Sequence, residues 1–429
     1  MRKKIVVRGP VLSMSGYGEQ TRFALRSLRK HEDKFDIYII PVGWGATGWQ
    51  HEYDEERIWF DRKIQKTADY MNSESDNVKF DMSLQVTIPN EWEPLAPYNI
   101  GYTAGIETTK VSPEWIQKTN LMDKVLVVSK HSKNIFEKTV HEGYIEETNQ
   151  PVVLKTEVPI ESVNYPVRQF KDVKVDLDLE YDFNYLTMAQ WGPRKNLFNT
   201  IRWFVEENFD QEVGLVVKTF MRRGTIIDRH HTNKRIASIL EKYKDRKCKI
   251  YLLHGDMSKD EINSLYSHPK IKALISLSHG EGFGLPMFEA AYNGMPVITT
   301  GWSGQCDFLY APLAGKKKKN KLHPYFAEVE YDIGPIQKES VWKGVLEEDS
   351  MWCYPKEGSY KMKLRQVRNN YDKWKKKADY LQKWILENFT EEEKYDKFAN
   401  FILKDLEIES SVTNEEVDEM FGKLFEEGK

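Results

Sequence analysis

The sequence is poor in cysteine and has no long apolar run. Its 429 residues include only three cysteines, Cys248, Cys306 and Cys353. Their odd number and wide spacing argue against a disulfide framework and indicate a reducing compartment. No segment approaches the roughly 18 consecutive apolar residues of a membrane-spanning helix, and the apolar run 5–7 near the start is too short for a signal peptide. These absences predict a cytoplasmic protein without a transmembrane segment.

The chain also lacks a strong net charge, since its formal charge is −3 at pH 7. A near-neutral chain has no bulk positive field to attract polyanions such as nucleic acid. Local basic groups do occur. An expected first helix carries Arg22, Arg26, Arg29 and Lys30 on one face, and the segment 315–323 is rich in lysine. Such groups suit an anionic surface of lipid headgroups or nucleic acid, although charge runs are most often only solvated, so this contact stays open.

Length and composition favour two ordinary domains. Hydrophobic residues make up 40% of the chain and aromatic residues 13%, which is enough for ordinary cores. Short β-rich apolar runs alternate with helical patterns in two series, as in parallel sheets with crossover helices. The repetition predicts an α/β fold of two successive doubly wound domains. The runs lie at 4–7, 36–40, 84–88, 99–103 and 124–128, and then at 184–188, 213–218, 248–253, 272–277 and 296–300.

The segment between the two series marks the expected domain boundary. Residues 157–176 carry two prolines and little periodicity, which is typical of a linker. We therefore expect a first domain over residues 1–168 and a second domain over residues 169–389.

The C-terminal part of the sequence has helical patterns. They fill residues 358–406, and Thr390 with Glu393 forms a capping box that predicts a new helix start. We expect helices over residues 390–429 to cross back and complete the first domain. The closing segment 414–429 has an apolar face, which favours packing on its own protein over contact with a partner.

A Gly-rich turn carries the strongest chemical signal. The stretch SHGEGFGLPMFEAAYNGMPVITT (278–300) places Glu281 in a strand-to-helix turn and Glu289 in the first turn of a short helix. Free N–H groups at a helix start attract phosphate oxygens, and Gly282 and Gly284 allow a close backbone approach. Carboxylates at the same place suit a ligand that also carries vicinal hydroxyls. A nucleotide sugar combines a diphosphate with two hydroxylated rings.

The stretch EGFGLPMFE, followed by AAYNGMPVITT, resembles the Glu-x7-Glu signature of the retaining GT-B glycosyltransferases of family 4. The resemblance implies two Rossmann-like domains that face a cleft, with the nucleotide-sugar donor on the second domain. It also implies that Glu281 contacts the transferred sugar and Glu289 the ribose. The other donor-binding residues of this turn are Gly282, Phe283, Gly284 and Leu285.

Departure of a diphosphate requires positive charge nearby. Arg194 and Lys195 follow the first expected strand of the second domain, and Lys218 ends the second, where side chains point into the crevice. Lys195 resembles the phosphate-binding lysine of the family. Asn196 stands where the family usually has glycine, and the arginine that usually precedes the lysine is missing. Arg194 and Lys218 are candidates to replace it.

The segment YLLHGDMSKDEINSLY (251–266) resembles the part of the family whose loop holds the nucleobase. The resemblance implies that backbone groups near His254, Gly255 and Met257 read the base edge. The side chain of His254 suits packing within the loop equally well.

Two features of the first domain point to the same crevice. Gly16 and Gly18 follow the first strand, but no acid ends the second strand, so the fragment is weak evidence for a dinucleotide site. It fits better the family's first-domain glycine loop, which faces the diphosphate and the acceptor. Glu107 lies in a loop after a strand, where function is common, and is a candidate to face the acceptor hydroxyl. The family's first-domain histidine has no counterpart that we can place.

Metal ligation is not indicated. Asp176 and Asp178 lie in the expected linker, away from any strand end, and His230 and His231 are adjacent, so on a helix they face different sides. We expect no metal and no cofactor, since the nucleotide sugar is a substrate.

Together with these features, the resemblance implies a retaining hexosyl- or pentosyltransferase that uses a UDP-, GDP- or ADP-sugar. The default acceptor is a hydroxyl of a glycan or a lipid-linked glycan. Transfer to a hydroxylated base in DNA is an alternative that the basic helix permits and the near-neutral chain disfavours. A GT-B nucleotide-sugar epimerase is a second alternative. A binding module with a degenerate site is opposed by the intact pair Glu281 and Glu289.

Overall fold

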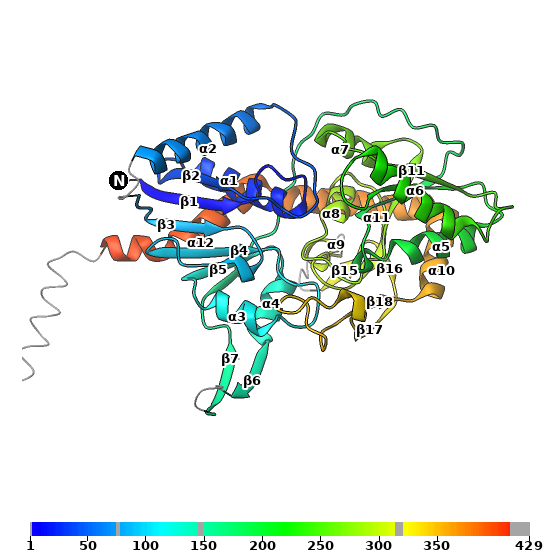
Figure 1. Ribbon diagram of the computed structural model, residues 1–429. Helices are drawn as coiled ribbons and strands as arrows, with labels where there is room; N and C mark the ends of the chain where they lie inside the picture. The colour runs from blue at the N-terminus through cyan, green and yellow to red at the C-terminus, as the bar shows by residue number, and fades with distance from the viewer. Residues whose placement is uncertain (1, 74–77, 145–148, 314–320, 412–429) are drawn as a thin grey trace, which may run out of the picture.

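Two six-stranded parallel sheets, each with helices on its faces, form the body of the molecule (Figure 1). This arrangement confirms the expected α/β architecture of two doubly wound domains. The computed structural model describes residues 2–73, 78–144, 149–313 and 321–411. Most of the basic segment 315–323 lies outside these residues. The closing segment 414–429 lies entirely outside them.

The first sheet has the strand order β2-β1-β3-β4-β5-β8. Its inner strands are covered by helices on both faces, so runs such as Ile5, Val6 and Val7 are buried, as expected for a parallel sheet. The five predicted runs of this half all match strands. The strands are β1 (Lys3–Gly9), β2 (Phe35–Pro41), β3 (Met82–Gln85), β4 (Tyr98–Thr103), β5 (Lys124–Val127) and β8 (Ile160–Ser162), and the helices are α1 (Gly16–Lys30), α2 (Glu55–Ser73), η1 (Pro89–Glu91), α3 (Pro113–Thr119) and α4 (Lys130–Lys138).

The second sheet has the order β11-β10-β9-β12-β13-β16. The five predicted runs of the second half match β9 to β13. The strands are β9 (Asn184–Gln190), β10 (Gly214–Phe220), β11 (Lys249–Leu253), β12 (Ile271–Ser276), β13 (Val297–Thr300) and β16 (Ala327–Val329). The helices are η2 (Pro193–Lys195), α5 (Leu197–Asn208), α6 (Ile226–Leu240), α7 (Lys259–Ser267), α8 (Leu285–Tyr292) and α9 (Cys306–Leu309).

The segment expected to be a linker contains a strand. β8 lies within residues 157–176 and pairs in parallel with β5, so the linker prediction is wrong for this part. A strand of three residues is too short to produce a periodic pattern. Residues 163–183, which follow, carry neither helix nor strand. The boundary at residue 168 stays a prediction.

Three antiparallel hairpins were not predicted, and one of them connects the two domains. The loop between β17 and β18 reaches the first domain, where Gly344 O accepts hydrogen bonds from Asn90 Nδ2 at 2.9 Å and from Ser112 Oγ at 2.8 Å. Thr109 N also donates to Met351 O at 2.9 Å. The hairpins are β6 (Val140–Tyr144) with β7 (Pro151–Lys155), β14 (Tyr310–Pro312) with β15 (Leu322–Pro324), and β17 (Tyr331–Pro335) with β18 (Met351–Pro355), and η3 (Lys338–Ser340) lies in the last of these loops.

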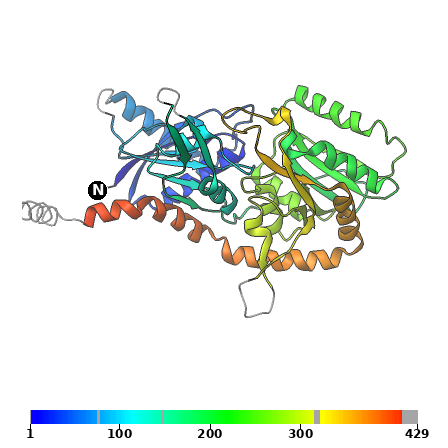
Figure 2. The same ribbon diagram turned by 90° about the horizontal axis from the view of Figure 1, so that it is seen from below.

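The C-terminal helices run along both domains, as Figure 2 shows for the orange and red ribbons. They are α10 (Glu357–Asn369), α11 (Tyr371–Asn388) and α12 (Glu391–Ser411). Thr390 Oγ1 accepts from Glu393 N at 3.3 Å, which supports the predicted helix start. The ring of Phe398 on α12 packs in the first-domain core, 5.4 Å from the ring of Phe23. The expected return to the first domain is thus confirmed for the described part of α12.

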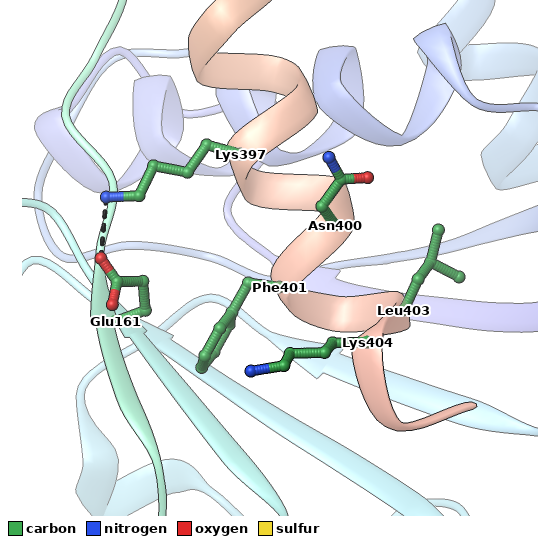
Figure 3. A pocket seen from close by; sticks show the side chains of 6 residues that line it. All are labelled: Glu161, Lys397, Asn400, Phe401, Leu403 and Lys404. Carbon is green, nitrogen blue, oxygen red and sulfur yellow. Dashed lines mark ion pairs between the residues drawn. The ribbon is translucent and has the colours of Figure 1, made fainter. Parts of the chain in front are cut away.

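Polar contacts also hold α12 to the edge strand β8. Lys397 Nζ lies 2.7 Å from Glu161 Oε1, beside a shallow pocket that the two elements form (Figure 3). Among the helices of the described residues, none is both long and apolar enough to cross a bilayer.

The predicted basic face of α1 is not a free surface. Arg22 is only 4% exposed, and its Nε donates to Glu19 Oε2 at 3.0 Å. Arg26 is largely buried and its Nη1 lies 3.0 Å from Glu56 Oε1. These two arginines therefore offer no free charge to an anionic surface, because acidic side chains of α1 and α2 pair with them. Helical spacing shows which residues share a face but not what covers it.

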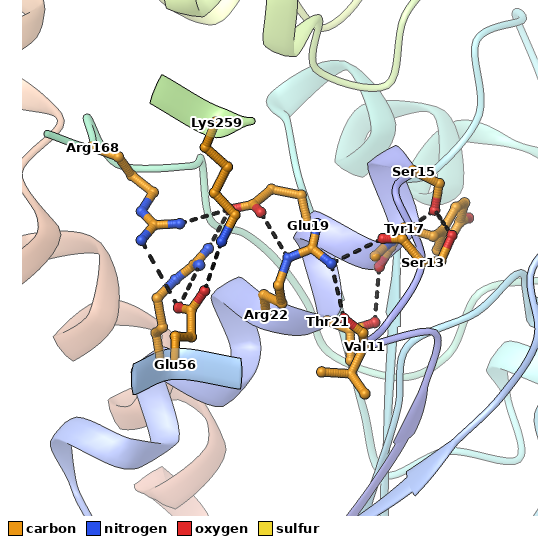
Figure 4. Close-up of polar contacts among 12 residues, drawn as sticks. Val11, Ser13, Ser15, Tyr17, Glu19, Thr21, Arg22, Glu56, Arg168 and Lys259 are labelled. Carbon is orange, nitrogen blue, oxygen red and sulfur yellow. Dashed lines mark hydrogen bonds and ion pairs between the residues drawn. The ribbon is translucent and has the colours of Figure 1, made fainter. Parts of the chain in front are cut away.

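Glu56 also belongs to a contact between the domains. Lys259 of α7, in the second domain, donates to Glu56 Oε2 at 3.2 Å. Arg168, in the connection between the domains, lies 3.6 Å from Glu19 Oε1 and 3.9 Å from Glu56 Oε1 (Figure 4). Two partly buried carboxylates of the first domain therefore pair with cations from three parts of the chain. Although burial opposes ionisation, Arg26 and Arg168 hold the pKa of Glu56 at about 2.

Candidate functional site

Four charged side chains meet where the carboxyl edge of the second sheet faces the first domain. Lys195 Nζ donates to the two carboxylate oxygens of Glu281 at 2.5 and 2.7 Å. Arg194 Nη1 donates to Glu281 Oε2 at 3.2 Å, and Arg194 Nη2 lies 3.2 Å from Glu107 Oε1. The structure thus brings together all four residues predicted to be catalytic. We call Glu107, Arg194, Lys195 and Glu281 the charged cluster.

Ion pairing fixes the protonation of the central carboxylate. Although burial acts to raise it, Lys195 and Arg194 lower the pKa of Glu281 to about 2. Burial and the neighbouring Arg194 lower the pKa of Lys195. Glu281 is therefore anionic at neutral pH, the form that accepts hydrogen bonds from sugar hydroxyls. A small pocket lined by β9, β12 and α8 opens beside Lys195 and Glu281.

The turn that presents Lys195 explains the departure from the usual Lys-Gly pair. Asn196 has φ 53°, in the left-handed region, and acts as N-cap of α5. Glycine adopts this conformation most easily, and asparagine tolerates it better than most residues. Asn196 Nδ2 also donates to Leu277 O at 3.2 Å. Asn196 therefore adopts a turn conformation that also suits glycine, and its side chain anchors the turn to the residue that follows β12.

The loop after β13 holds the backbone of Glu281. Glu281 N donates to Ser303 Oγ at 2.9 Å, and Gly304 N donates to Glu281 O at 3.0 Å. Ser303 has φ 71°, an unfavourable conformation for serine. A Cβ atom on Gly304 would lie 2.0 Å from Gly282 O, so the close packing of the two loops needs glycine there. These contacts fix the direction of the Glu281 side chain.

Two glycines of the turn serve the approach of the first domain. A Cβ atom on Gly282 would lie 2.5 Å from Ala104 O, and one on Gly280 would lie 2.3 Å from Glu107 O. In this structure the lack of a side chain at Gly282 admits the loop that carries Glu107. The expected contact of Gly282 with the donor stays a prediction. Gly284 is the N-cap of α8 and has φ 96°, a left-handed conformation that favours glycine.

The apolar residues of the turn contribute by packing. The Phe283 side chain is buried, with its ring 5.1 Å from that of Tyr165 and 4.9 Å from that of Phe308. Leu285 is partly buried against the same core. The side chain of Phe283 is therefore not available to a donor, which leaves its backbone as the group that a ligand can reach.

Glu289 is the fifth residue of α8 and lies just beyond the predicted first turn, because the helix begins at Leu285, one residue earlier than expected. Tyr266 on α7 donates its hydroxyl to Glu289 Oε2 at 2.8 Å. Burial raises the pKa of Glu289 to about 7. The carboxyl group therefore changes protonation near neutral pH, and one of its oxygens is held by the phenol.

The expected base-binding loop is stabilised by the side chains of two residues that were predicted to bind the donor. Lys218 Nζ donates to Gly255 O, and burial lowers the pKa of this lysine. His254 Nε2 lies 2.8 Å from Asp228 Oδ2, inside the protein. Both side chains support the loop at residues 254–258. The side chain of His254 is therefore packed within the protein, which is the second of the two roles that the sequence left open for this residue.

The first-domain glycine loop is held from inside by Arg22. Its Nη1 donates to Val11 O at 2.8 Å and to Ser13 O at 2.9 Å. A Cβ atom on Gly18 would lie 2.0 Å from Ser13 O, whereas the space around Gly16 is open. Gly18 is therefore needed for the tight turn, and Gly16 leaves backbone accessible, as a loop that faces a ligand requires.

Several residues that shape the site had no signal in the sequence. Tyr266, Ser303 and Arg22 act through partners that lie 23, 22 and at most 11 residues away, respectively. The roles of Ser303 and Arg22 become visible only from the positive φ of Ser303 and the burial of Arg22. Neither property can be read from a residue pattern. Among the described residues, no group of three or more His, Cys, Asp or Glu side chains is placed to hold a metal ion.

Comparison with known proteins agrees with this geometry. Residues 182–311 match the protein family described as Glycosyl transferases group 1, a range that includes Arg194, Lys195 and Glu281. Comparison with curated protein sequences gave no match.

The comparison of structures identifies the architecture. The chain is similar to sucrose-phosphate synthase from Thermosynechococcus elongatus over 95% of this chain and 100% of that chain, with 10% identity and a TM-score of 0.60. It is similar to Anabaena HepE in complex with UDP and glucose over 94% and 100% of the two chains, with 11% identity and a TM-score of 0.56. It spans 55% of the length of an S. aureus TarM mutant, with 75% of this chain covered, 14% identity and a TM-score of 0.46. The chain therefore has the GT-B fold of two Rossmann-like domains, and its second domain carries a glycosyl transferases group 1 region.

Proposed function

We propose that the protein transfers a sugar from a nucleoside diphosphate sugar to a hydroxyl of a glycan or lipid-linked glycan, with retention of anomeric configuration, as in family 4. The charged cluster carries this proposal. It combines two cations for a leaving diphosphate with carboxylates for sugar hydroxyls, at the carboxyl edge where α/β sheets bind ligands. The Anabaena HepE structure contains UDP and glucose, which is the same ligand chemistry.

Each residue has a role that follows from its position. Glu281 orients the transferred sugar through its hydroxyls, and Glu289, near the start of α8, accepts hydrogen bonds from the ribose. Lys195 and Arg194 stabilise the charge that develops on the departing diphosphate, together with the N-terminus of α8. Glu107 faces the acceptor from the first domain and holds Arg194.

The reaction is a same-face displacement. The bond between the anomeric carbon and the diphosphate oxygen breaks, and a bond from that carbon to the acceptor oxygen forms on the same face. The acceptor proton passes to an oxygen of the leaving diphosphate. No carboxylate is needed as a covalent nucleophile, which agrees with the engagement of Glu281 by two cations.

A turnover assay tests the proposal. The protein is incubated with UDP-, GDP- and ADP-sugars, with and without neutral oligosaccharides, a lipid-linked glycan and DNA that contains a hydroxylated base. Nucleotide release and the anomeric configuration of the product by NMR are measured. We expect acceptor-dependent release, a retained configuration and an unchanged rate after EDTA treatment.

Two variants calibrate the assay. Glu281→Gln should lower kcat by about a hundredfold or more, the usual effect of removing a key electrostatic contact, whereas Glu387→Gln on the exposed face of α11 should not. Donor conversion without acceptor would indicate an epimerase, and transfer only to DNA would favour the DNA glycosyltransferase alternative. No turnover of any donor, or equal rates for wild type and Glu281→Gln, would contradict the proposal.

A further inference from the structure

The loop between β2 and α2 presents aromatic side chains at the carboxyl edge of the first sheet. It covers residues 42–54 and contains Trp44, Trp49 and Tyr53. Trp49 is 62% exposed and Tyr53 is 72% exposed. Exposed aromatic side chains that gather at the ligand-binding edge of a sheet usually mark an interaction site.

The backbone of this loop is fixed. Met14 N donates to Gly48 O at 2.9 Å, and Gln50 N donates to Leu12 O at 2.8 Å, so that Ser13 and Trp49 form an antiparallel bridge. Ser13 Oγ and Thr47 Oγ1 are 2.7 Å apart. Trp49 is thus anchored to the same glycine loop that Arg22 holds. A loop whose backbone is already fixed loses little conformational entropy when a ligand binds to it.

The aromatic groups continue inward towards the end of β4. The Trp44 ring stacks on that of Tyr17, with centroids 4.3 Å apart and planes inclined by 34°. Tyr17 Oη lies 2.8 Å from Thr103 Oγ1, at the end of β4 and just before the loop of Glu107. The Trp44–Tyr17 pair and its contact to Thr103 therefore link the loop 42–54 to the end of β4, which precedes the loop that carries Glu107.

The charges around the loop indicate what it binds. Glu52, Asp54 and Glu55 lie beside the aromatic residues, and Asp54 and Glu55 are exposed. Their negative charge opposes the phosphates of DNA or of anionic lipid headgroups. A neutral pyranose ring meets no such repulsion. It offers an apolar face of C–H groups to an indole and hydroxyls to the carboxylates at its rim.

We propose that Trp44 and Trp49 form the acceptor platform of this protein and that the acceptor is a neutral glycan whose pyranose rings stack on them. This inference rests on the proposed function and specifies its acceptor. Trp44, beside Tyr17, receives the ring nearest the reacting hydroxyl, and Trp49 receives the next part of the glycan. The loop also lies against the second domain at Gly48. A Cβ atom added to Gly48 would lie 3.4 Å from Asp256 Oδ1.

Acceptor kinetics test the platform. Cellobiose, maltose and lactose serve as probes, with the donor that gives the highest turnover. Trp49→Ala and Trp44→Ala should raise the acceptor KM by about tenfold or more, and Trp49→Phe should restore part of the loss. Nucleoside diphosphate binding and nucleotide release without acceptor should stay at wild-type level. Because Trp49 is exposed, its removal should not unfold the protein, which circular dichroism checks.

Tyr144→Ala provides the matched control, since this aromatic residue is 70% exposed on the β6–β7 hairpin. It should leave the acceptor KM unchanged. Equal acceptor KM values for wild type, Trp44→Ala and Trp49→Ala would overturn the platform, as would a preference for DNA over every neutral glycan.

A binding measurement tests the acceptor platform independently of the proposed transferase activity. Saturation-transfer NMR with the same disaccharides measures binding without turnover. Contacts that are present in wild type and lost in Trp49→Ala support the platform even if no donor is turned over. Absence of contacts to all three disaccharides in wild type contradicts it, while donor turnover would still support the transferase.

Discussion

At the residue scale, the site depends on the contrast between two carboxyl groups eight positions apart. Glu281 is held ionised by Lys195 and Arg194, whereas burial raises the pKa of Glu289 to about 7. The sequence predicts that both glutamates belong to one site, because their spacing and the glycines form a recognisable motif. It does not predict their different protonation, which depends on partners from other elements, such as Tyr266.

The raised pKa of Glu289 makes stability depend on pH. In the folded protein this group titrates near pH 7, compared with its ordinary value of 4.5. Between these values the folded state retains a proton that the unfolded state has lost, so its contribution is complete below pH 4.5 and is lost as the pH rises through about 7. Glu289→Gln should remove this decline. The variant should therefore gain stability relative to wild type from about pH 5 to about pH 8, as urea unfolding at several pH values will show.

Tyr266→Phe gives the matching control for Glu289. The phenol hydrogen bond lowers the pKa of Glu289, so its loss should move the inflection to higher pH. Stability profiles of wild type and Glu289→Gln that run parallel across this range would contradict the assignment.

At the scale of the element, the glycine loop between β1 and α1 depends on the buried Arg22. Arg22→Met would leave Val11 O and Ser13 O without this donor and Glu19 without one of its cations. We expect a loss of at least about 2 kcal/mol of unfolding free energy, because buried acceptors would lose their partner. The loop should also lose its shape, so kcat/KM should fall.

Arg29→Met on the same helix is the control, since Arg29 is exposed and rests on the ring of Trp59. Urea unfolding and kinetics should show an effect of less than about 1 kcal/mol. Equal effects of the two substitutions on stability and kinetics would contradict a special role for Arg22 in holding the glycine loop.

Elements differ in how well the sequence predicts them. The runs at 4–7 and 184–188 became β1 and β9 because strands covered on both faces are continuously apolar. The strand β8 was missed because it has only three residues, and β17 was missed because it is mostly exposed and lacks an apolar run. Their existence depends on neighbouring strands, which a local pattern does not contain.

At the scale of the whole molecule, α12 ties the end of the chain to the first domain. Phe398 is fully buried, with its ring 5.4 Å from Phe23 and 5.2 Å from Tyr102. Phe398→Ala should therefore lower the unfolding free energy by about 3–5 kcal/mol, the usual cost of truncating a buried aromatic side chain. Leu386→Ala on α11 should change it by less than about 0.5 kcal/mol, because that side chain is 47% exposed. A small effect at Phe398 in urea unfolding would mean that α12 is not part of the first-domain core.

The central claim is that the charged cluster holds the diphosphate of a nucleotide sugar. Isothermal titration of UDP, GDP and ADP into wild type, Lys195→Met and Lys373→Met tests it most directly, because Lys195 belongs to the cluster and Lys373 is an exposed lysine of α11. We expect wild type and Lys373→Met to bind one of the three nucleotides equally well. Lys195→Met, folded as judged by circular dichroism, should bind it at least about tenfold more weakly. Equal affinity of all three proteins, or no binding of any nucleotide by wild type, would contradict the claim.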